Sequence, residues 1–246
     1  MRLSRRVAEL AGCSRREAEL YIEGGWVRVN GVVQESPQHR VQDDTVALDP
    51  AARQQPPVTP TPVTMVLHKP PGCISHAAPG QPQAAIDWLQ TERHDPRDRS
   101  GIRPLQRHWR GLEPVTPLET GASGLVVFTQ DWRVKRKLVD DAALVEHEIM
   151  VDVRGTVAPP ALQQLNRAPW VEGRAGSSAR VSVNRQSGEV TGLRFALKGY
   201  EPGQLAQRCS ALDLEILAIR RMRMGRLPLA GLPEGQWRYL APHERF

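Results

Sequence analysis

The first fifty residues begin with two stretches of helical periodicity. Leu3 and Val7 are spaced as one face of a helix, and Gly12 stands where such a helix is expected to end. Ser14 and Glu17 then have the spacing of a capping box, in which each side chain accepts a hydrogen bond from the other residue's backbone N–H. The pattern predicts two short helices, the second ending before a pair of glycines.

Alternation typical of strands follows these helices. Residues 26–29 and 32–33 flank Asn30 and Gly31, the preferred dipeptide of a two-residue hairpin turn. Two helices and a hairpin make a compact unit, so the sequence predicts a small domain over residues 1–49.

Residues 50–64 separate this domain from a larger one. They contain five prolines and few apolar residues that could pack, which predicts a semi-rigid, extended linker. The larger domain is then expected to span residues 65–246 and to open with a short apolar strand from Met65 to His68.

The larger domain alternates strand-like and helical segments. Buried strands are predicted at residues 125–129 and 146–153, and Asp131 is placed to cap a helix between them. From Val181 onward we expect further strands, interrupted by one helix at residues 204–212. This order predicts an α+β fold with a mixed, mostly antiparallel sheet and a few helices.

The region between residues 80 and 114 is polar and broken. A short helix is expected around residues 84–91. Beyond it, residues 92–110 combine several arginines with Trp109. This composition predicts either an RNA-contacting loop or a disordered, solvated insertion.

The composition fits a globular protein that meets polyanions. Of the 246 residues, 40% are hydrophobic, which is enough for a core. Lys and Arg number 33 against 27 Asp and Glu, so the net charge is +6 and the pI is about 9.7. Nucleic acid is therefore the first partner to consider, although a mildly basic balance is also compatible with solubility alone.

Other features of the composition exclude several classes of protein. The three cysteines lie far apart and fit a reducing cytoplasm, while the seven histidines lack ligand spacing, so no metal site is expected. The chain opens without an apolar signal segment, and it contains no apolar run of roughly eighteen residues. We expect a cytoplasmic protein that does not enter the membrane.

The two predicted helices of the first domain carry a cluster of arginines. Only Glu9 offsets them within the first sixteen residues. They could grip phosphates on one face, or they could form an ordinary solvated helical surface. The cluster consists of Arg2, Arg5, Arg6, Arg15 and Arg16.

The segment PLETGASGLVVFTQD, residues 117–131, contains the strongest candidate chemistry. Glu119 lies in a short turn that precedes a corner of small residues and the buried strand. A carboxylate at the mouth of a strand is a candidate nucleophile. The alternative is a solvent-exposed loop carboxylate without chemistry.

Three motifs resemble those of one RNA-modifying family. The run SRREAE, followed by VRVNG, is similar to the small RNA-binding domain shared by a ribosomal small-subunit protein, some tRNA synthetases and bacterial pseudouridine synthases. Residues 117–131 resemble the catalytic motif of pseudouridine synthases, with Glu119 in place of the aspartate. Residues 221–225, RMRMG, resemble the family's late motif. Over its whole length the chain resembles the RsuA-like pseudouridine synthases.

The resemblance implies the pseudouridine synthase fold for residues 65–246 and an isomerase that needs no cofactor. In such an enzyme a carboxylate attacks the target uridine, whose base detaches, turns and rejoins the ribose through carbon. Glu119 then stands at the position of the nucleophile, and Ile149 at the position of an aromatic wall against the uracil. Gln207 stands at the position of a basic partner, with Arg208 one residue further along.

The resemblance also implies a partner, structured RNA, with ribosomal RNA expected, bound by a monomeric protein. RNA-contacting residues are expected outside the first domain as well. These are Lys69, Arg133, Lys135, Arg221 and Arg223.

Two functions of different classes follow from these motifs. The first is isomerisation of a uridine in ribosomal RNA. The second is a catalytically silent relative that binds ribosomal RNA during ribosome assembly. Two observations favour it: Glu119 has one methylene more than aspartate, which moves its carboxylate oxygens by roughly 1 Å. In addition, Pro117, Ile149 and Gln207 replace residues that the chemistry of the resembled family uses. A third, weaker interpretation is a general RNA-surface protein whose second domain binds another protein.

Overall fold

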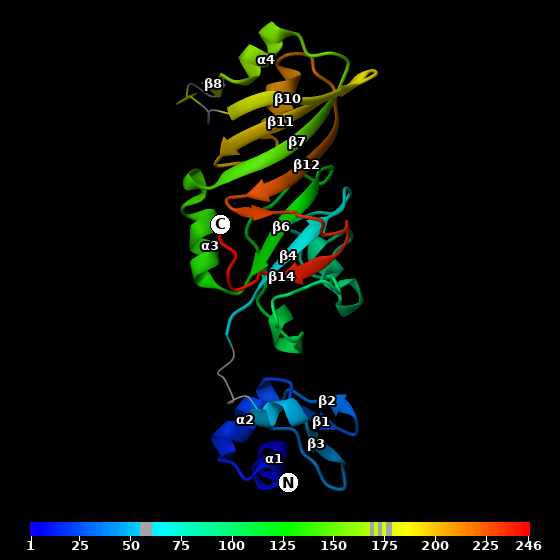
Figure 1. Cartoon of the computed structure of the whole chain (residues 1–246), viewed down its shortest axis with the longest axis vertical. Helices are drawn as coiled ribbons and strands as arrows, with labels where there is room; N and C mark the ends of the chain where they lie inside the picture. Colours follow the sequence, from blue (N-terminus) through cyan, green and yellow to red (C-terminus); the bar gives the residue numbers. More distant parts are fainter. Residues whose placement is uncertain (55–60, 168–169, 172–173, 176–178) are drawn as a thin grey trace. The chain divides into compact units, whose positions relative to one another are not determined.

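The computed structural model describes residues 1–54, 61–167, 170–171, 174–175 and 179–246. The predicted linker therefore lies partly outside the described residues. The chain divides into two compact units, which Figure 1 shows coloured along the sequence. The first consists of Met1–Pro62 with Ile102–Gly111, and the second of Val63–Gly101 with Leu112–Phe246. We describe each unit by itself.

The first unit contains the two helices and the hairpin that the sequence predicts. Its elements are α1 Leu3–Ala11, α2 Arg15–Glu23, β1 Val27–Val29, β2 Val32–Val33, β3 Val46–Leu48 and a 3-10 helix, η1 Pro50–Gln54. The capping box at Ser14 and Glu17 is formed in both directions. Asn30 and Gly31 both have positive φ, 50° and 84°, as a type I′ hairpin turn requires. The sheet order is β2-β1-β3.

One side of each helix closes the core of the first unit. Leu3 and Val7 of α1 meet Ala18 and Ile22 of α2 over Val27 of β1, and all five are fully buried. The helical periodicity in the sequence therefore corresponds to a real core face. The opposite sides of both helices stay in solvent and carry the arginines.

Residues 102–111 belong to the first unit rather than to the unit that surrounds them in sequence. The guanidinium of Arg103 lies 4.1 Å from the centre of the Trp26 ring, donates to the Gly25 carbonyl at 2.9 Å, and pairs with Asp49 at 3.1 Å. The backbone N–H of Gln106 also donates to a carboxylate of this unit. The prediction of a disordered insertion is therefore wrong for residues 102–111, which pack as an ordered segment that we call the strap. Contact of this segment with RNA stays a prediction.

The second unit is built on a nine-stranded sheet. Seven strands follow the order β10-β11-β7-β12-β6-β4-β14, while β13 pairs with β12 and β5 with β6. The only parallel pair among the described strands is β12 with β6, so the sheet is mixed and mostly antiparallel, as predicted. The strands are β4 Thr64–Lys69, β5 Glu113–Pro114, β6 Ser123–Thr129, β7 Glu146–Arg154, β10 Ala179–Ser187, β11 Val190–Lys198, β12 Ile216–Met224, β13 Leu227–Pro228 and β14 Trp237–Tyr239; a separate ribbon pairs β8 Trp170–Val171 with β9 Arg174–Ala175.

The parallel contact between β6 and β12 depends on a glycine. Gly124 pairs with Arg221 and has a φ of +112°. A Cβ at this position would collide with the Arg221 backbone. Only glycine combines this backbone conformation with so close an approach.

Helices are few in the second unit and lie at the sheet's margins. The α-helices are α3 Trp132–Val139, α4 Pro159–Leu165 and α5 Gln204–Ser210, and the 3-10 helices are η2 Ala85–Trp88, η3 Thr91–Arg93 and η5 Ala142–Leu144. A further 3-10 helix, η4 Gln106–Trp109, lies in the strap of the first unit. Asp131 caps α3 as expected, accepting from the Arg133 N–H. The helix expected at residues 84–91 is instead two 3-10 turns, and α4 was not predicted.

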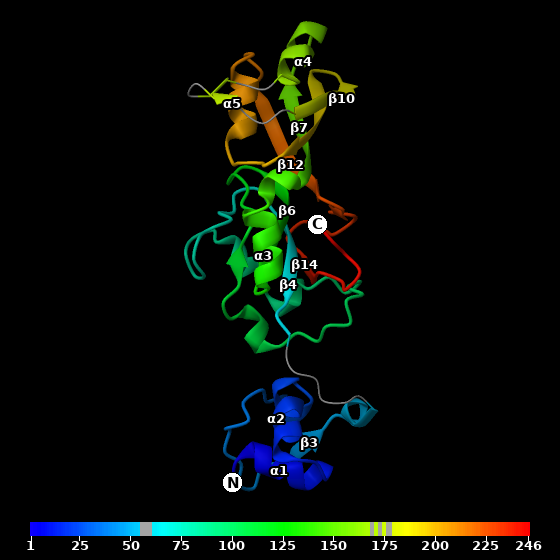
Figure 2. The same cartoon turned by 90° about the vertical axis from the view of Figure 1, so that its left-hand side faces the viewer.

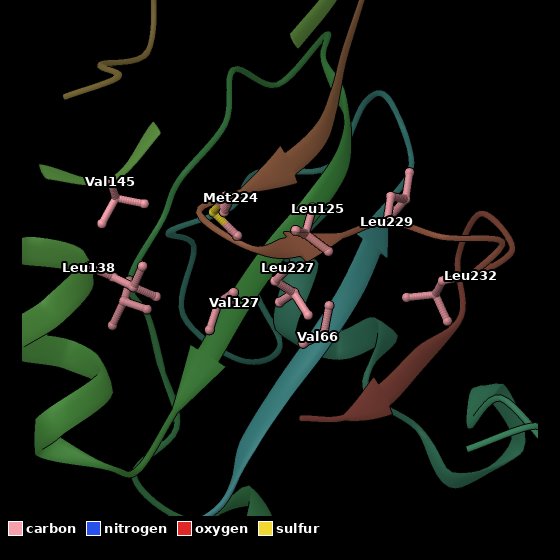
Figure 3. Close-up of a cluster of buried hydrophobic side chains, with 10 residues drawn as sticks. Val66, Leu125, Val127, Leu138, Val145, Met224, Leu227, Leu229 and Leu232 are labelled. Atoms are coloured by element: carbon pink, nitrogen blue, oxygen red, sulfur yellow. The ribbon is translucent and has the colours of Figure 1, made fainter. Parts of the chain in front are cut away.

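One core cluster lies where α3 meets the central strands. Leu138 of α3 and Val145 are buried with Val66 of β4 and Leu125 and Val127 of β6 (Figure 3). Viewed from the side, α3 lies in front of these strands (Figure 2). The end of the chain closes the cluster through Met224, Leu227, Leu229 and Leu232. β4 and β6 are buried along their whole length and form the base on which the Glu119 loop lies.

No helix in the described part of the chain is both long enough and apolar enough to cross a membrane.

Candidate functional site

Glu119 lies in the loop that joins β5 to β6. The Ala122 N–H donates to the Glu119 carbonyl at 3.0 Å, which closes the turn. Ser75 fastens the loop one residue earlier, because its hydroxyl donates to the Leu118 carbonyl and accepts from the Leu118 N–H. The carboxylate is thus presented from a defined turn at the mouth of β6, where the sequence predicts it.

Two buried cations hold the backbone of this loop. Lys69, at the end of β4, donates to the carbonyls of Thr120 at 3.2 Å and Ala122 at 2.6 Å. Arg221, on β12, donates to the carbonyls of Leu125 at 2.8 Å, Pro117 at 3.4 Å, and Thr116. Both side chains are fully buried. Their hydrogen bonds order the loop on either side of Glu119.

Burial changes the protonation equilibria of both cations. Removal from water lowers the pKa of Lys69 to about 8, and the negative charge of Glu119 opposes this change. Removal from water also lowers the pKa of Arg221 to about 10, again opposed by Glu119. Glu119 therefore acts on both cations through space.

The Glu119 carboxylate itself is held by two neutral donors. The Tyr200 hydroxyl donates to Oε2, and the Gly203 N–H donates to Oε1 at 2.8 Å. Among the described residues, no lysine, arginine or histidine forms an ion pair with Glu119. Burial and the neighbouring Glu119 charge both raise the pKa of Tyr200, so its hydroxyl stays protonated. The result is a half-buried anion bound by uncharged groups.

Tyr200 also makes the only aromatic contacts at the described site. Its ring lies 5.7 Å from the Arg221 guanidinium and 5.8 Å from the His147 ring, both measured to ring centres. Burial, together with Arg221 and Arg223, lowers the pKa of His147 to about 3, so the imidazole is neutral near pH 7. Its Nδ1 is buried without a hydrogen-bond partner among the described residues.

The structure brings some of the predicted site residues together but not all. Ile149 is fully buried on β7 opposite Arg221 of β12, so it lies at the floor of the site. Gln207 is exposed on α5. Arg208 is buried and donates to the carbonyls of Leu165 and Arg167 at 3.1 Å each. An arginine directed at the end of α4 does not replace the missing basic partner of Glu119.

The predicted RNA-contacting residues also divide into two groups. Lys69 and Arg221 are fully buried and hold the Glu119 loop, and their contact with RNA stays a prediction. Arg223 pairs with Glu146 at 2.6 Å and is mostly covered. The remaining residues are exposed, namely Arg2, Arg5, Arg6, Arg15, Arg16, Arg133 and Lys135.

Several exposed arginines of the first unit have acidic partners. Arg5 pairs with Glu9 at 3.0 Å, and Arg15 and Arg16 lie 3.5 and 3.7 Å from Glu19. Such exposed pairs contribute little to stability. They leave the guanidinium groups accessible to phosphates, and an RNA-contacting role for these residues stays a prediction.

Tyr200, Gly203 and His147 are the site residues that sequence reasoning missed. None stands at a position where the resembled motifs require a functional group. One signal existed for Gly203 alone, since glycine is common in a turn between a strand and a helix. That loop's approach to Glu119, 81 residues earlier, depends on the sheet order.

The arrangement holds the Glu119 carboxylate in one position. The hydrogen bonds from Tyr200 and Gly203 occupy one lone pair on each carboxylate oxygen, and a nucleophile attacks through such lone pairs. A cation that could compensate the charge in a transition state does not contact Glu119 among the described residues. No group of three or more histidine, cysteine, aspartate or glutamate side chains in the described residues is placed to hold a metal ion.

Known proteins share both the sequence pattern and the fold. Residues 1–46 match the S4 domain family. The dual-specificity RNA pseudouridine synthase RluF of Escherichia coli (strain K12) is 23% identical over 249 residues, which cover 99% of this chain and 77% of RluF. The ribosomal large subunit pseudouridine synthase B of Bacillus subtilis (strain 168) is 25% identical over 250 residues, covering 99% of this chain and 93% of that protein. A crystal structure of a pseudouridylate synthase superposes with a TM-score of 0.60 at 16% identity, covering 98% of this chain and 96% of that one.

An S4 domain joined to a pseudouridine synthase fold defines the class of this protein. S4 domains bind RNA, and the relatives that match the whole chain are named pseudouridine synthases. Over nearly its whole length the chain is similar to pseudouridine synthases of the RluF and large-subunit synthase B type, and it shares the fold of a pseudouridylate synthase.

Proposed function

We propose that the protein binds structured ribosomal RNA through its S4 domain and does not isomerise uridine. The pseudouridine synthase fold then serves as a second RNA-binding body. We place this activity in the cytoplasm, in a monomer that acts during ribosome assembly.

One observation carries the proposal. The Glu119 carboxylate, at the position of the family's nucleophile, accepts hydrogen bonds from Tyr200 and Gly203 and forms no ion pair among the described residues. A nucleophile in a transition state needs positioning and charge compensation, and displacement by about 1 Å can cost about a hundredfold in rate. Tyr200 and Gly203 position the Glu119 carboxylate, but neither carries the positive charge that would compensate a transition state.

A second candidate function is isomerisation with Glu119 as a modified nucleophile. The observation that favours it is the ordered loop: Lys69 and Arg221 fix the backbone around Glu119, and Tyr200 supplies an aromatic ring beside the carboxylate. This alternative requires a substrate to displace Tyr200 and Gly203 from Glu119.

RNA affinity, measured at increasing salt concentration, tests the binding proposal. Purified full-length protein is titrated into labelled ribosomal RNA fragments, and the dissociation constant is followed by fluorescence anisotropy. We expect affinity to fall steeply with salt, because phosphate contacts release counterions. Arg15→Ala should weaken binding and lower the salt slope by about 1. Arg245→Ala, which removes an exposed arginine outside the S4 domain, is the matched control.

Glu119→Gln separates the two candidate functions. If the protein only binds RNA, this variant keeps the wild-type affinity, and neither protein forms pseudouridine in the bound RNA. If Glu119 is a nucleophile, wild-type protein forms pseudouridine and Glu119→Gln does not. Undetectable RNA binding at low salt would overturn both candidates.

A further inference from the structure

Helix α3 presents an exposed face that combines an aromatic ring with positive charge. Trp132, Lys135, Arg136 and Val139 follow the spacing i, i+3, i+4 and i+7, which places them on one side of a helix. The Trp132 side chain is 63% exposed and that of Val139 47% exposed. We call these four residues, with the adjoining Arg133, the α3 face.

The α3 face is not a part of the core that has failed to pack. The opposite side of the helix carries Leu138, which is buried in the cluster that contains Val127 (Figure 3), and Val134, which packs against the same cluster. The helix therefore has its full apolar anchor without Trp132. An indole left in water on a well-anchored helix has no role in folding that the described contacts show.

The charges around the indole suit an anionic partner. The Arg133 guanidinium lies 5.8 Å from the centre of the Trp132 ring. Arg136 is exposed and forms no ion pair among the described residues, whereas Lys135 pairs with Glu113. Asp131, just before the helix, caps it by accepting from the Arg133 N–H.

We propose that the α3 face is a second RNA-binding surface, on which an unpaired base stacks against Trp132 while Arg133 and Arg136 contact the flanking phosphates. Aromatic rings among cations are the usual means of binding single-stranded nucleic acid without sequence preference. The proposal rests on the RNA binding proposed above. It adds a contact for single-stranded segments, whereas S4-type recognition of structured RNA depends on shape and backbone.

Substitutions at Trp132 distinguish stacking of a base on the indole ring from nonspecific binding to an apolar side chain. Trp132→Phe keeps an aromatic face, while Trp132→Leu keeps apolar bulk without one. Binding of oligouridine and of a blunt RNA hairpin is measured for each full-length variant. We expect Trp132→Leu to weaken oligouridine binding about tenfold, Trp132→Phe to retain most of the affinity, and the hairpin affinity to change little.

A direct signal comes from the indole itself. In protein labelled with 5-fluorotryptophan, the ¹⁹F resonance that is missing in Trp132→Phe belongs to Trp132. This resonance should shift on adding oligouridine and should stay in place on adding polyglutamate, which represents an acidic protein partner.

The outcomes separate this inference from the function on which it rests. If the hairpin and oligouridine bind but the Trp132 resonance and the Trp132→Leu affinity are unchanged, the α3 face is not an RNA surface, and the proposed function stands. A shift produced equally by polyglutamate, or a Trp132→Leu protein that binds like wild type, also overturns the inference. If neither RNA binds, both proposals fail.

Discussion

At the scale of single residues, Glu119 and Tyr200 form a matched pair. The extra methylene of glutamate carries the carboxylate toward the loop after β11, where the Tyr200 hydroxyl and the Gly203 N–H receive it. An aspartate at position 119 is shorter by one carbon and could not keep both bonds without movement of the loop. The length of the glutamate side chain therefore matches the position of its two donors.

A double-mutant cycle measures the Glu119 and Tyr200 interaction. Tyr200→Phe removes the hydroxyl, and we expect the free energy of unfolding to fall by about 1–2 kcal/mol, because the donor serves a charged acceptor. The loss should be smaller in a Glu119→Gln background, giving a coupling energy of about 1 kcal/mol in urea unfolding. Tyr21→Phe, in the first unit, is the control. Strictly additive effects would show that the two side chains do not interact.

Buried His147 predicts a specific pH dependence. Its pKa is lowered to about 3, so the unfolded chain binds this proton at higher pH than the folded protein does. Stability should therefore be lost as pH falls from about 6.5 toward 3, with a slope of at most about 1.4 kcal/mol per pH unit from this group. Urea unfolding of His147→Leu across this window should show a flatter profile than wild type. The same substitution at exposed His243 controls for loss of an imidazole, and equal slopes for His147→Leu and wild type would contradict the prediction.

Sequence patterns located Glu119 but not its environment. Its place before β6 follows from small residues and a buried strand, which are local features. Tyr200 meets Glu119 and His147 only through the order of β7, β11 and β12, which no local pattern encodes. The positive charges of Lys69 and Arg221 suggested RNA contacts. The sequence did not show that both side chains are buried, where they donate to backbone carbonyls.

At the scale of elements, the loop from Thr116 to Ala122 depends on two strands for its order. Arg221 of β12 bonds carbonyls at both ends of the loop, and Lys69 of β4 bonds carbonyls near its corner. A buried carbonyl without a hydrogen-bond donor destabilises the folded state. Lys69 and Arg221 supply these donors, which explains why two buried cations lie here without a carboxylate in contact with them. The site loop and the sheet are therefore one structural unit.

Arg221→Met tests this dependence. It leaves three carbonyls without their donor, and we expect the free energy of unfolding to fall by about 3 kcal/mol or more. Hydrogen exchange at the Leu118 and Ala122 amides should accelerate more than in the core of β6. Arg226→Met, at an exposed position just after β12, is the control. Unchanged exchange in the loop would mean that Arg221 does not hold it.

Elements with strong local signals were predictable, and those without were not. Three features depend only on residues close together in sequence, and the structure forms all three. They are the capping box at Ser14, the turn at Asn30 and Gly31, and the cap at Asp131. The strap at residues 102–111 has no periodicity of its own. Its position depends on Arg103 meeting Trp26 and Asp49, contacts between distant parts of the chain.

At the scale of the whole molecule, the protein has a pseudouridine synthase fold in which neutral donors hold Glu119. The S4 domain match and the relatives named pseudouridine synthases support our proposal that the protein binds RNA. The neutral donors on Glu119 support our proposal that it does so without isomerising uridine. These two proposals together make the central claim: an RNA-binding protein with the fold of an RNA-modifying enzyme.

Mapping of pseudouridines in ribosomal RNA tests this claim most directly. Ribosomal RNA is isolated from cells with and without the protein, and every pseudouridine is located by mass spectrometry. We predict the same set of sites in both samples. A site that is missing in the deletion, restored by the wild-type protein and not restored by Glu119→Gln would contradict the claim and establish Glu119 as a catalytic residue.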